Sequence, residues 1–276
     1  MIWKKIKNRY EYIFCLFTML VMNLSLVNLY DMLFWAPLYW GYSLFIPLYY
    51  STVQNNQLHG IETLILGLSS VALGQIVTIG YYVIYNKYYW KKYCICAIEQ
   101  LLYHPEGLAL MGVYLALYWA SGYMPSSYYT TNCGIYWNHV LSQLLLQDFL
   151  QFVVHYIEHK NSYLYRKLHQ SHHRFIHPTL LDAFSGSYQD SICMIIVPLF
   201  VTSRMIHTNA WSYMVFGTIY ANLLSLIHSE VDHPWDPFSS VLGIGTARDH
   251  RCHHKKLKKN YGHIFMFWDQ LFGTYA

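Results

Sequence analysis

Four long apolar stretches constrain the fold of this chain more than any other feature. They cover residues 11–35, 62–85, 106–124 and 134–155. Each is close to the roughly 20 residues that a helix needs to cross the hydrocarbon core of a bilayer. Only 12% of the 276 residues are charged and 55% are hydrophobic, whereas about 25% of the residues in an average soluble protein are charged. The sequence therefore predicts a polytopic membrane protein.

The distribution of basic residues predicts how these stretches cross the membrane. Basic residues gather before the first stretch and after the second, at Lys4, Lys5, Lys7, Arg9, Lys87, Lys91 and Lys92. The two implied outer loops, around 53–60 and 125–133, contain no Lys or Arg. The positive-inside rule therefore places both termini in the cytosol, with four crossings. This count requires residues 36–50, which contain two prolines and a glycine, to lie in the interface or form a re-entrant hairpin.

Two further apolar stretches, 190–203 and 210–227, are shorter and are interrupted around Pro198 and Arg204. We expect them to form a helical hairpin that dips into one leaflet. Strand-like alternation is scarce along the whole chain. We therefore predict an all-α fold, a polytopic membrane helical bundle with about four spanning helices.

Histidine is concentrated in the second half of the chain, where 12 of the 16 histidines fall between residues 155 and 254. They form an HxxxH pair, two HxxHH boxes and a single histidine between the boxes. Neutral imidazole is the commonest nitrogen ligand for iron, zinc and copper, and the spacings i, i+3 and i+4 place rings on one helix face. The candidate ligands are His155, His159, His169, His172, His173, His228, His250, His253 and His254.

Nine imidazoles are too many for a closed tetrahedral zinc site with four ligands, but they suit two metal ions of higher coordination. Soluble di-iron bundles use glutamate together with histidine, whereas this chain has few carboxylates at matching places. The pattern therefore favours a dinuclear centre at a cytosolic, helical histidine-box site. The ligand set by itself leaves iron and zinc both open.

Five segments resemble a known family in their order and spacing. They are Asp148 with HYIEH, then YLYRKLHQSHH, IHSEVDHPW, DHRCHH and NYGHIFMFWDQLFGT. This pattern resembles the membrane fatty acid hydroxylase and sterol desaturase superfamily over about residues 140–275. We therefore expect residues 1–139 to be an N-terminal transmembrane region and residues 140–276 a fatty acid hydroxylase-like catalytic region.

The resemblance implies an oxidoreductase of the endoplasmic reticulum membrane, a non-haem di-iron lipid hydroxylase or desaturase. It implies two Fe ions per chain held by the nine histidines, with O2 as co-substrate and a sterol or another long-chain lipid as substrate. Many sterol-acting members carry a His-Pro-x-Asp/Glu segment where this chain has Ser187 to Asp190. Hydroxylation and desaturation, and the class of lipid, stay open.

Electrons are expected to come from other proteins, because the chain contains no flavin or dinucleotide fingerprint. We expect a cytochrome b5-like electron donor and an NAD(P)H-dependent reductase. Four lysines after the last histidine box could dock an acidic donor or flank the membrane near anionic lipids. These are Lys255, Lys256, Lys258 and Lys259. The few, scattered charges argue against nucleic acid as a partner.

Several residues outside the nine histidines could support the metal ligands. Asp148 lies two helical turns before His155, so we expect its carboxylate to accept the second ring N–H of a ligating histidine. Asp249 could do the same, and His233 is a possible further ligand or hydrogen-bond partner of one. Asp269 is expected to pair with an arginine or a ligating histidine, and His263 to be an ordinary packing residue.

Two kinds of non-enzymatic membrane protein could also contain a histidine cluster. The first is a non-catalytic membrane protein with a structural, histidine-bound zinc site, which the completeness of the boxes disfavours. The second is a metal transporter, which would require ionisable residues within several spans. In this chain the histidines cluster beyond the last clear crossing instead.

Overall fold

The computed structural model describes residues 26–53, 58–86, 105–131 and 134–276, together with a few isolated positions between 95 and 103. These residues form helices and connecting segments, with one isolated bridge between Ile244 and Phe265 and no strand among them. The predicted all-α helical bundle is confirmed. The basic residues at 4–9 and 87–92, which predicted the orientation in the membrane, lie outside the described residues.

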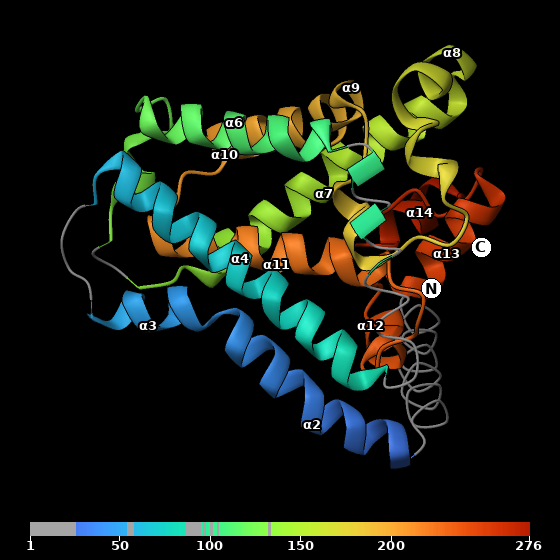
Figure 1. The fold of residues 1–276 in the computed structure, drawn as a ribbon, viewed down its shortest axis with the longest axis horizontal. Helices are drawn as coiled ribbons and strands as arrows, with labels where there is room; N and C mark the ends of the chain where they lie inside the picture. The colour runs from blue at the N-terminus through green and yellow to red at the C-terminus, as the bar shows by residue number, and fades with distance from the viewer. Residues whose placement is uncertain are drawn as a thin grey trace, which may run out of the picture.

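The long helices pack side by side, and the short C-terminal helices gather at one end of the bundle (Figure 1). Short 3-10 or π-helical segments connect several of them, and the π segment Ile192–Ile196 joins α9 directly to α10. The α-helices are α2 (Leu26–Ser43), α3 (Phe45–Val53), α4 (Gly60–Tyr85), α6 (Glu106–Ala120), α7 (Trp137–Lys160), α8 (Ser162–Leu164), α9 (Tyr188–Ser191), α10 (Val197–Met205), α11 (Ala210–Ile227), α12 (Asp236–Val241), α13 (Ala247–Lys256) and α14 (Phe267–Phe272).

Three of the described helices, α4, α7 and α11, are long and apolar enough to cross a membrane. The predicted span at 106–124 corresponds to α6, which is shorter, with 15 residues. Residues 210–227, the second arm of the expected hairpin, form α11, which is one of these three helices. Within α11, 78% of the apolar window is buried inside the protein, because this helix packs between α4 and α7 at the centre of the bundle.

The sequence predicted that one apolar stretch ends at residue 35 and that residues 36–50 form a separate segment. This division is wrong, because α2 continues through residues 35 and 36 with Pro37 inside the helix. Proline removes one helical hydrogen bond and usually breaks or kinks a helix. Here tertiary packing holds α2 in place directly after the proline. The Tyr39 hydroxyl hydrogen-bonds the Thr78 hydroxyl of α4 at 2.7 Å, and the Tyr39 ring packs edge-on against Tyr81. Helix α3 follows after the single residue Leu44.

Small and polar residues allow α4 and α11 to approach closely, as is common where helices meet in a membrane. The Ser70 and Thr218 hydroxyls hydrogen-bond at 2.8 Å, and the Gln75 amide donates to Asn222 Oδ1 at 3.0 Å. Gly74 lies between these pairs. A Cβ atom at position 74 would lie 2.8 Å from both Asn222 Oδ1 and Thr218 Cγ2, so the interface requires glycine there.

We predict that Gly74→Leu lowers the free energy of unfolding by about 1–3 kcal/mol, because overpacking forces the two helices apart. Thermal unfolding of the purified protein in detergent measures this change. Gly80→Leu on the same helix is the matched control, since a Cβ at position 80 meets no atom within 4 Å. Equal melting temperatures for the two variants would contradict this account of the interface.

Candidate metal centre

The nine candidate histidines come from separate elements that meet at one end of the bundle. The C-terminal half of α7 carries two of them, the segment between α7 and α9 carries three, the residue after α11 carries one, and α13 carries three. Helix α13 begins at a capping box, in which Thr246 and Asp249 satisfy each other's backbone N–H groups. This cap fixes the start of α13 and therefore the direction in which its histidines point.

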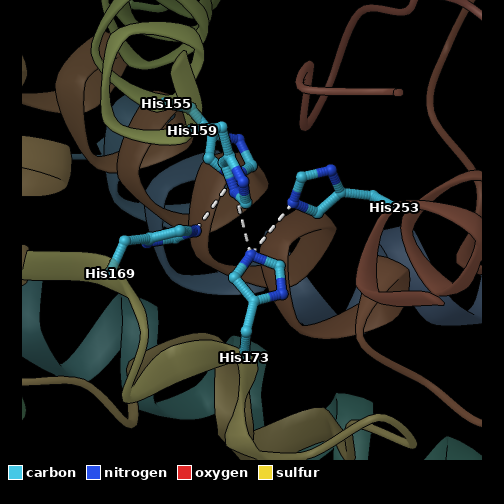
Figure 2. A group of neighbouring side chains, drawn as sticks. All are labelled: His155, His159, His169, His173 and His253. Carbon is cyan, nitrogen blue, oxygen red and sulfur yellow. Dashed lines mark hydrogen bonds between the residues drawn. The ribbon is translucent and has the colours of Figure 1, made fainter. Parts of the chain in front are cut away.

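Five histidines form a first group, whose rings point toward a common centre (Figure 2). Two Nε2–Nε2 pairs, His155 with His169 and His159 with His173, are each 3.0 Å apart. His253 Nε2 lies 3.1 Å from His173 Nε2. One ring nitrogen from each of the five lies within 4.8 Å of the others, so all five could hold one ion.

The remaining four histidines form a second group, adjacent to the first. His250 Nε2 lies 2.9 Å from His228 Nε2 and 3.1 Å from His254 Nε2. His172 Nε2 lies 3.4 Å from His228 Nε2, and the rings of His172 and His173 connect the two groups with centroids 5.5 Å apart. The structure thus brings all nine predicted histidines together, divided five and four.

The hydrogen-bond partners of Nδ1, the ring nitrogen that faces away from the centre, show which nitrogen has a free lone pair. In five of these histidines Nδ1 lies next to a backbone carbonyl oxygen, and in His169 it lies 3.0 Å from Asp190 Oδ1. A carbonyl oxygen can only accept, so Nδ1 carries the proton and Nε2 has a bare lone pair. The carbonyl pairs are His155 with Tyr261, His172 with Ser185, His228 with Leu224, His253 with Lys259, and His254 with Phe175.

Lone pairs that face one another at about 3 Å repel unless a cation lies between them. Two nitrogens that each bind one ion at about 2.1 Å, separated by about 90–110°, lie about 3.0–3.4 Å apart. The observed Nε2–Nε2 distances of 2.9–3.4 Å match this spacing. The donor set and its geometry therefore fit two metal ions, one in each group.

Burial keeps these imidazoles neutral and available to a metal. Burial lowers the pKa of His172 to about 4. Burial and the neighbouring histidines lower the pKa of His250 and His254 well below the ordinary value of 6.5. At neutral pH these rings are therefore uncharged, and each has one ring nitrogen whose lone pair is available to a metal ion.

Asp190 is a site residue that the sequence did not single out. Its carboxylate accepts the Nδ1–H of His169, while Glu158 Oε2 lies 3.6 Å from the same nitrogen. Burial raises the pKa of Asp190 to about 8, and the positive charge of a metal on His169 would oppose that rise. The Ser187–Asp190 segment, which looked like a departure from the family pattern, thus supplies the acid that orients a candidate ligand.

The predicted role of Asp148 as a direct partner of a histidine ring is wrong. Its carboxylate accepts the backbone N–H of Ile264 and Phe265 at 2.7 and 2.9 Å, and the indole N–H of Trp268 at 3.1 Å. Asp148 therefore holds the turn that contains Tyr261, whose carbonyl accepts the Nδ1–H of His155. Asp148 therefore supports the His155 ring indirectly, by holding the turn whose carbonyl group binds that ring.

Asp249, Asp269 and His233 also differ from expectation. Asp249 caps α13 and accepts the Tyr275 hydroxyl at 3.3 Å. Asp269 accepts the backbone N–H groups of residues 261 and 262 at 2.8 and 2.7 Å, and contacts neither an arginine nor a ligand ring. His233 lies outside both groups, because Nδ1 accepts from the Tyr81 hydroxyl and Nε2 donates to the carbonyl of residue 226.

His263 was expected to be an ordinary packing residue, but it lies against both groups. It is 5% exposed, and its ring stacks on His155 with centroids 4.9 Å apart. The His250 ring is 5.5 Å away. His263 stands outside the histidine boxes, so spacing gave no signal for it.

The pocket beside the histidines lies next to a cavity in the interior of the bundle. A small pocket beside the rings is lined by residues that include His169, His172, His228 and His263. It shares Phe184, Ile195 and Leu224 with a larger, almost wholly apolar cavity. That cavity lies between α4, α6, α10 and α11. An apolar molecule in the cavity would therefore extend toward the candidate metal centre.

Comparison with known proteins identifies the family of the chain. The family model for fatty acid hydroxylases matches residues 140–274. An "alternative squalene epoxidase" of Phaeodactylum tricornutum is 43% identical over 229 residues, which are 77% of this chain and 65% of that protein. A "cholesterol 25-hydroxylase-like protein" of Danio rerio is 30% identical over 191 residues, 67% of this chain and 73% of that protein. No solved structure matches the chain.

The chain therefore belongs to the fatty acid hydroxylase family, as its histidine boxes suggested. It is an integral membrane protein with histidine clusters that could bind metal. A further relative, methylsterol monooxygenase 1 of Danio rerio, is 28% identical over about half of each chain. The family and the names of these relatives indicate a lipid or sterol oxygenase or desaturase.

We predict that the metal-free protein loses stability as the pH falls from 7 toward 5. The folded-state pKa values of His172 and His263, about 4 and about 3, lie below the ordinary value. Between those values and about 6.5 the unfolded chain binds more protons, so acid favours unfolding, by up to about 1.4 kcal/mol per pH unit for each such group. Melting temperatures in detergent at pH 7, 6 and 5 test this; a flat profile would contradict it.

We also predict that each group holds its own ion. Replacing His253 with alanine should weaken metal binding in the first group, and replacing His228 should weaken it in the second, each by more than the roughly 10–100-fold that loss of a ligand's hydrogen-bond partner costs. Metal analysis of the purified variants should therefore give about one ion per chain in place of two. His177→Ala is the control, because this histidine is exposed and belongs to neither group. Two ions in all three variants would exclude the assignment.

Proposed function

We propose that this protein is a membrane-bound, O2-dependent lipid oxidoreductase that holds two iron ions in its two histidine groups. Its substrate would be a sterol, squalene or another long-chain lipid, which it hydroxylates, epoxidises or desaturates. The observation that carries the proposal is the apolar cavity that shares Phe184, Ile195 and Leu224 with the pocket beside the histidines. A hydrocarbon chain in this cavity would lie next to the pocket that borders the candidate metal centre.

The nine histidines would hold the iron, five in the first group and four in the second. When bound, iron supplies the activation of O2 that oxidation of an unactivated C–H or C=C bond requires. The protein residues do the remaining work. The backbone carbonyls of residues 224, 259 and 261 fix the ring orientations, which keeps each Nε2 directed inward.

The cavity lining would align the lipid and exclude water. Trp119, Met214 and Phe216 are among the apolar side chains along it, and Phe184 lies where it joins the pocket. A low-water environment prevents side reactions of a reactive oxidant and favours attack on the bound lipid. A linear or flat hydrocarbon fits such a lining, whereas a charged headgroup would lose its hydration without a compensating partner.

The names of the relatives support a squalene or sterol substrate before a fatty acid. The two relatives with the highest identity among those described above are named for squalene and for cholesterol. Since the match covers 65% of the squalene epoxidase, that activity is a proposal for this chain. Other relatives are named as a sterol desaturase and an aldehyde decarbonylase, so the relatives of this chain carry the names of several different reactions.

We further propose that electrons come from a cytochrome b5-like protein and an NAD(P)H-dependent reductase. Lys255, Lys256 and Lys258 are exposed directly after the last histidine box, and an acidic donor docked there would lie close to the second group. The proposed setting is the endoplasmic reticulum, with the metal site and both termini in the cytosol. In this proposal residues 1–139 anchor the protein and residues 140–276 form the catalytic region.

The alternative is a non-catalytic membrane protein whose histidines bind structural zinc. The cavity argues against it, because a structural site needs no path for a lipid. Zinc in a purified sample would not favour it, since zinc competes well for imidazole ligands. Turnover distinguishes the two proposals.

We predict that cells expressing the wild type under 18O2 accumulate one lipid class that carries the label. Lipid mass spectrometry detects the label, or a new double bond if the reaction is desaturation. A His172→Ala, His173→Ala double variant should abolish the product, because it removes one candidate ligand from each group. His177→Ala should retain it.

Full activity in the double variant would exclude the di-iron proposal. A wild type that binds iron, receives electrons from an added reductase system and changes no lipid would favour the non-catalytic alternative. A product formed by the wild type and lost in the double variant would name both the reaction and the substrate.

A further inference from the structure

Two buried polar atoms in the small pocket beside the histidines have no hydrogen-bond partner among the described residues. They are Oε1 of Gln151 and Nδ1 of His263. The side chains are 2% and 5% exposed. A buried polar atom without a partner is unfavourable, so two of them at one pocket point to a ligand that supplies the missing bonds.

Neither residue belongs to the two histidine groups. Gln151 lies one helical turn before His155 on α7, so both side chains lie on the same face of that helix. His263 also lines the pocket, and its ring stacks on His155 and lies near His250. The pair therefore lies where the pocket meets the candidate metal centre.

The backbone around His263 is rigidly held. Asp148 accepts the next two backbone N–H groups along the chain, and Asp269 accepts the two that precede His263. Gly245 lies against the same turn, and a Cβ atom there would lie 2.3 Å from the His263 carbonyl oxygen. His263 is thus positioned before any ligand binds.

The chemistry of the two atoms defines the group that they would bind. An amide oxygen accepts a hydrogen bond, and a neutral imidazole Nδ1 that carries the proton donates one. A hydroxyl group satisfies both at once, because it donates its hydrogen to Gln151 and accepts from His263. A hydrocarbon leaves both atoms without a partner.

We infer that Gln151 and His263 form a binding site for the hydroxyl group of a lipid alcohol, whose hydrocarbon part occupies the apolar cavity. This inference rests on the proposed lipid function and deepens it. The hydroxyl is either present on the substrate next to the reacting carbon or is the oxygen that the reaction installs there. Both residues act as positioning residues, which fix the lipid relative to the metals.

Binding of hexadecan-1-ol and of hexadecane tests the inference, because the two probes differ by one hydroxyl group. Radiolabelled probe is bound to the iron-loaded, full-length protein in detergent, and the ratio of the two affinities is measured. Each hydrogen bond contributes about 1 kcal/mol, or about five-fold in affinity. Gln151→Met and His263→Phe should each lower the alcohol-to-alkane ratio about five-fold or more.

Two variants serve as controls. Gln143→Met makes the same chemical change on the same helix, at a buried glutamine whose Oε1 is also unpaired but which lines neither cavity; it should leave the ratio unchanged. His263→Asn retains a side-chain N–H and should preserve most of the preference. Iron content should stay equal in all four variants, because none of the three residues belongs to a histidine group.

An unchanged ratio in both Gln151→Met and His263→Phe would overturn the inference, and so would loss of iron in His263→Phe. Because the assay measures binding, it separates this inference from the proposed function. A shifted ratio in a protein that oxidises no lipid would leave the hydroxyl site in place and remove the oxygenase proposal. Oxygenase activity with an unshifted ratio would remove the hydroxyl site alone.

Discussion

The rest of the structure depends on the mutual repulsion of buried imidazole lone pairs. Seven of the nine clustered histidines are buried, and their inward nitrogens lie 2.9–3.4 Å apart. Without a cation such an arrangement is unfavourable where both outer nitrogens donate to oxygen atoms, as in His155 with His169, because two buried acceptors then face each other. The surrounding fold must therefore hold the rings in place, and a metal ion removes the repulsion when it binds.

The scaffold holds the rings mainly through backbone atoms, whose positions follow from the fold itself. Asp148 and Asp269 bind successive N–H groups of the turn at 261–265, and that turn presents the carbonyl that orients His155. A substitution far from the metal groups can thus move a ligand by moving this turn. Asp190 orients His169 directly, which gives this chain a carboxylate next to the first group.

The position of the site at one end of the bundle explains how metal chemistry and lipid chemistry can meet. The polar histidines lie beyond the apolar parts of α7 and α11, while the cavity between α4, α6, α10 and α11 lies among those apolar parts. The shared lining residues Phe184 and Leu224 make the transition between the two environments. The apolar cavity favours hydrocarbon, and the pocket beside the histidines offers hydrogen-bonding groups. This arrangement suits a lipid that reacts near a polar end.

The sequence by itself determined the family from five ordered segments and the all-α fold from apolar stretches without strand-like alternation. It also determined the nine histidines that meet at the site, because their i, i+3 and i+4 spacing is a local pattern. Local patterns did not determine how those residues divide into groups of five and four, since adjacent His172 and His173 join different groups. Tertiary packing also decided that α2 continues through Pro37 and that α11 is a central helix. Asp190, His263 and Asp148 acquired their roles from contacts with residues 21, 108 and 117 positions away, namely His169, His155 and Phe265. Such contacts depend on how helices cross, and sequence spacing within one helix contains no information about that crossing.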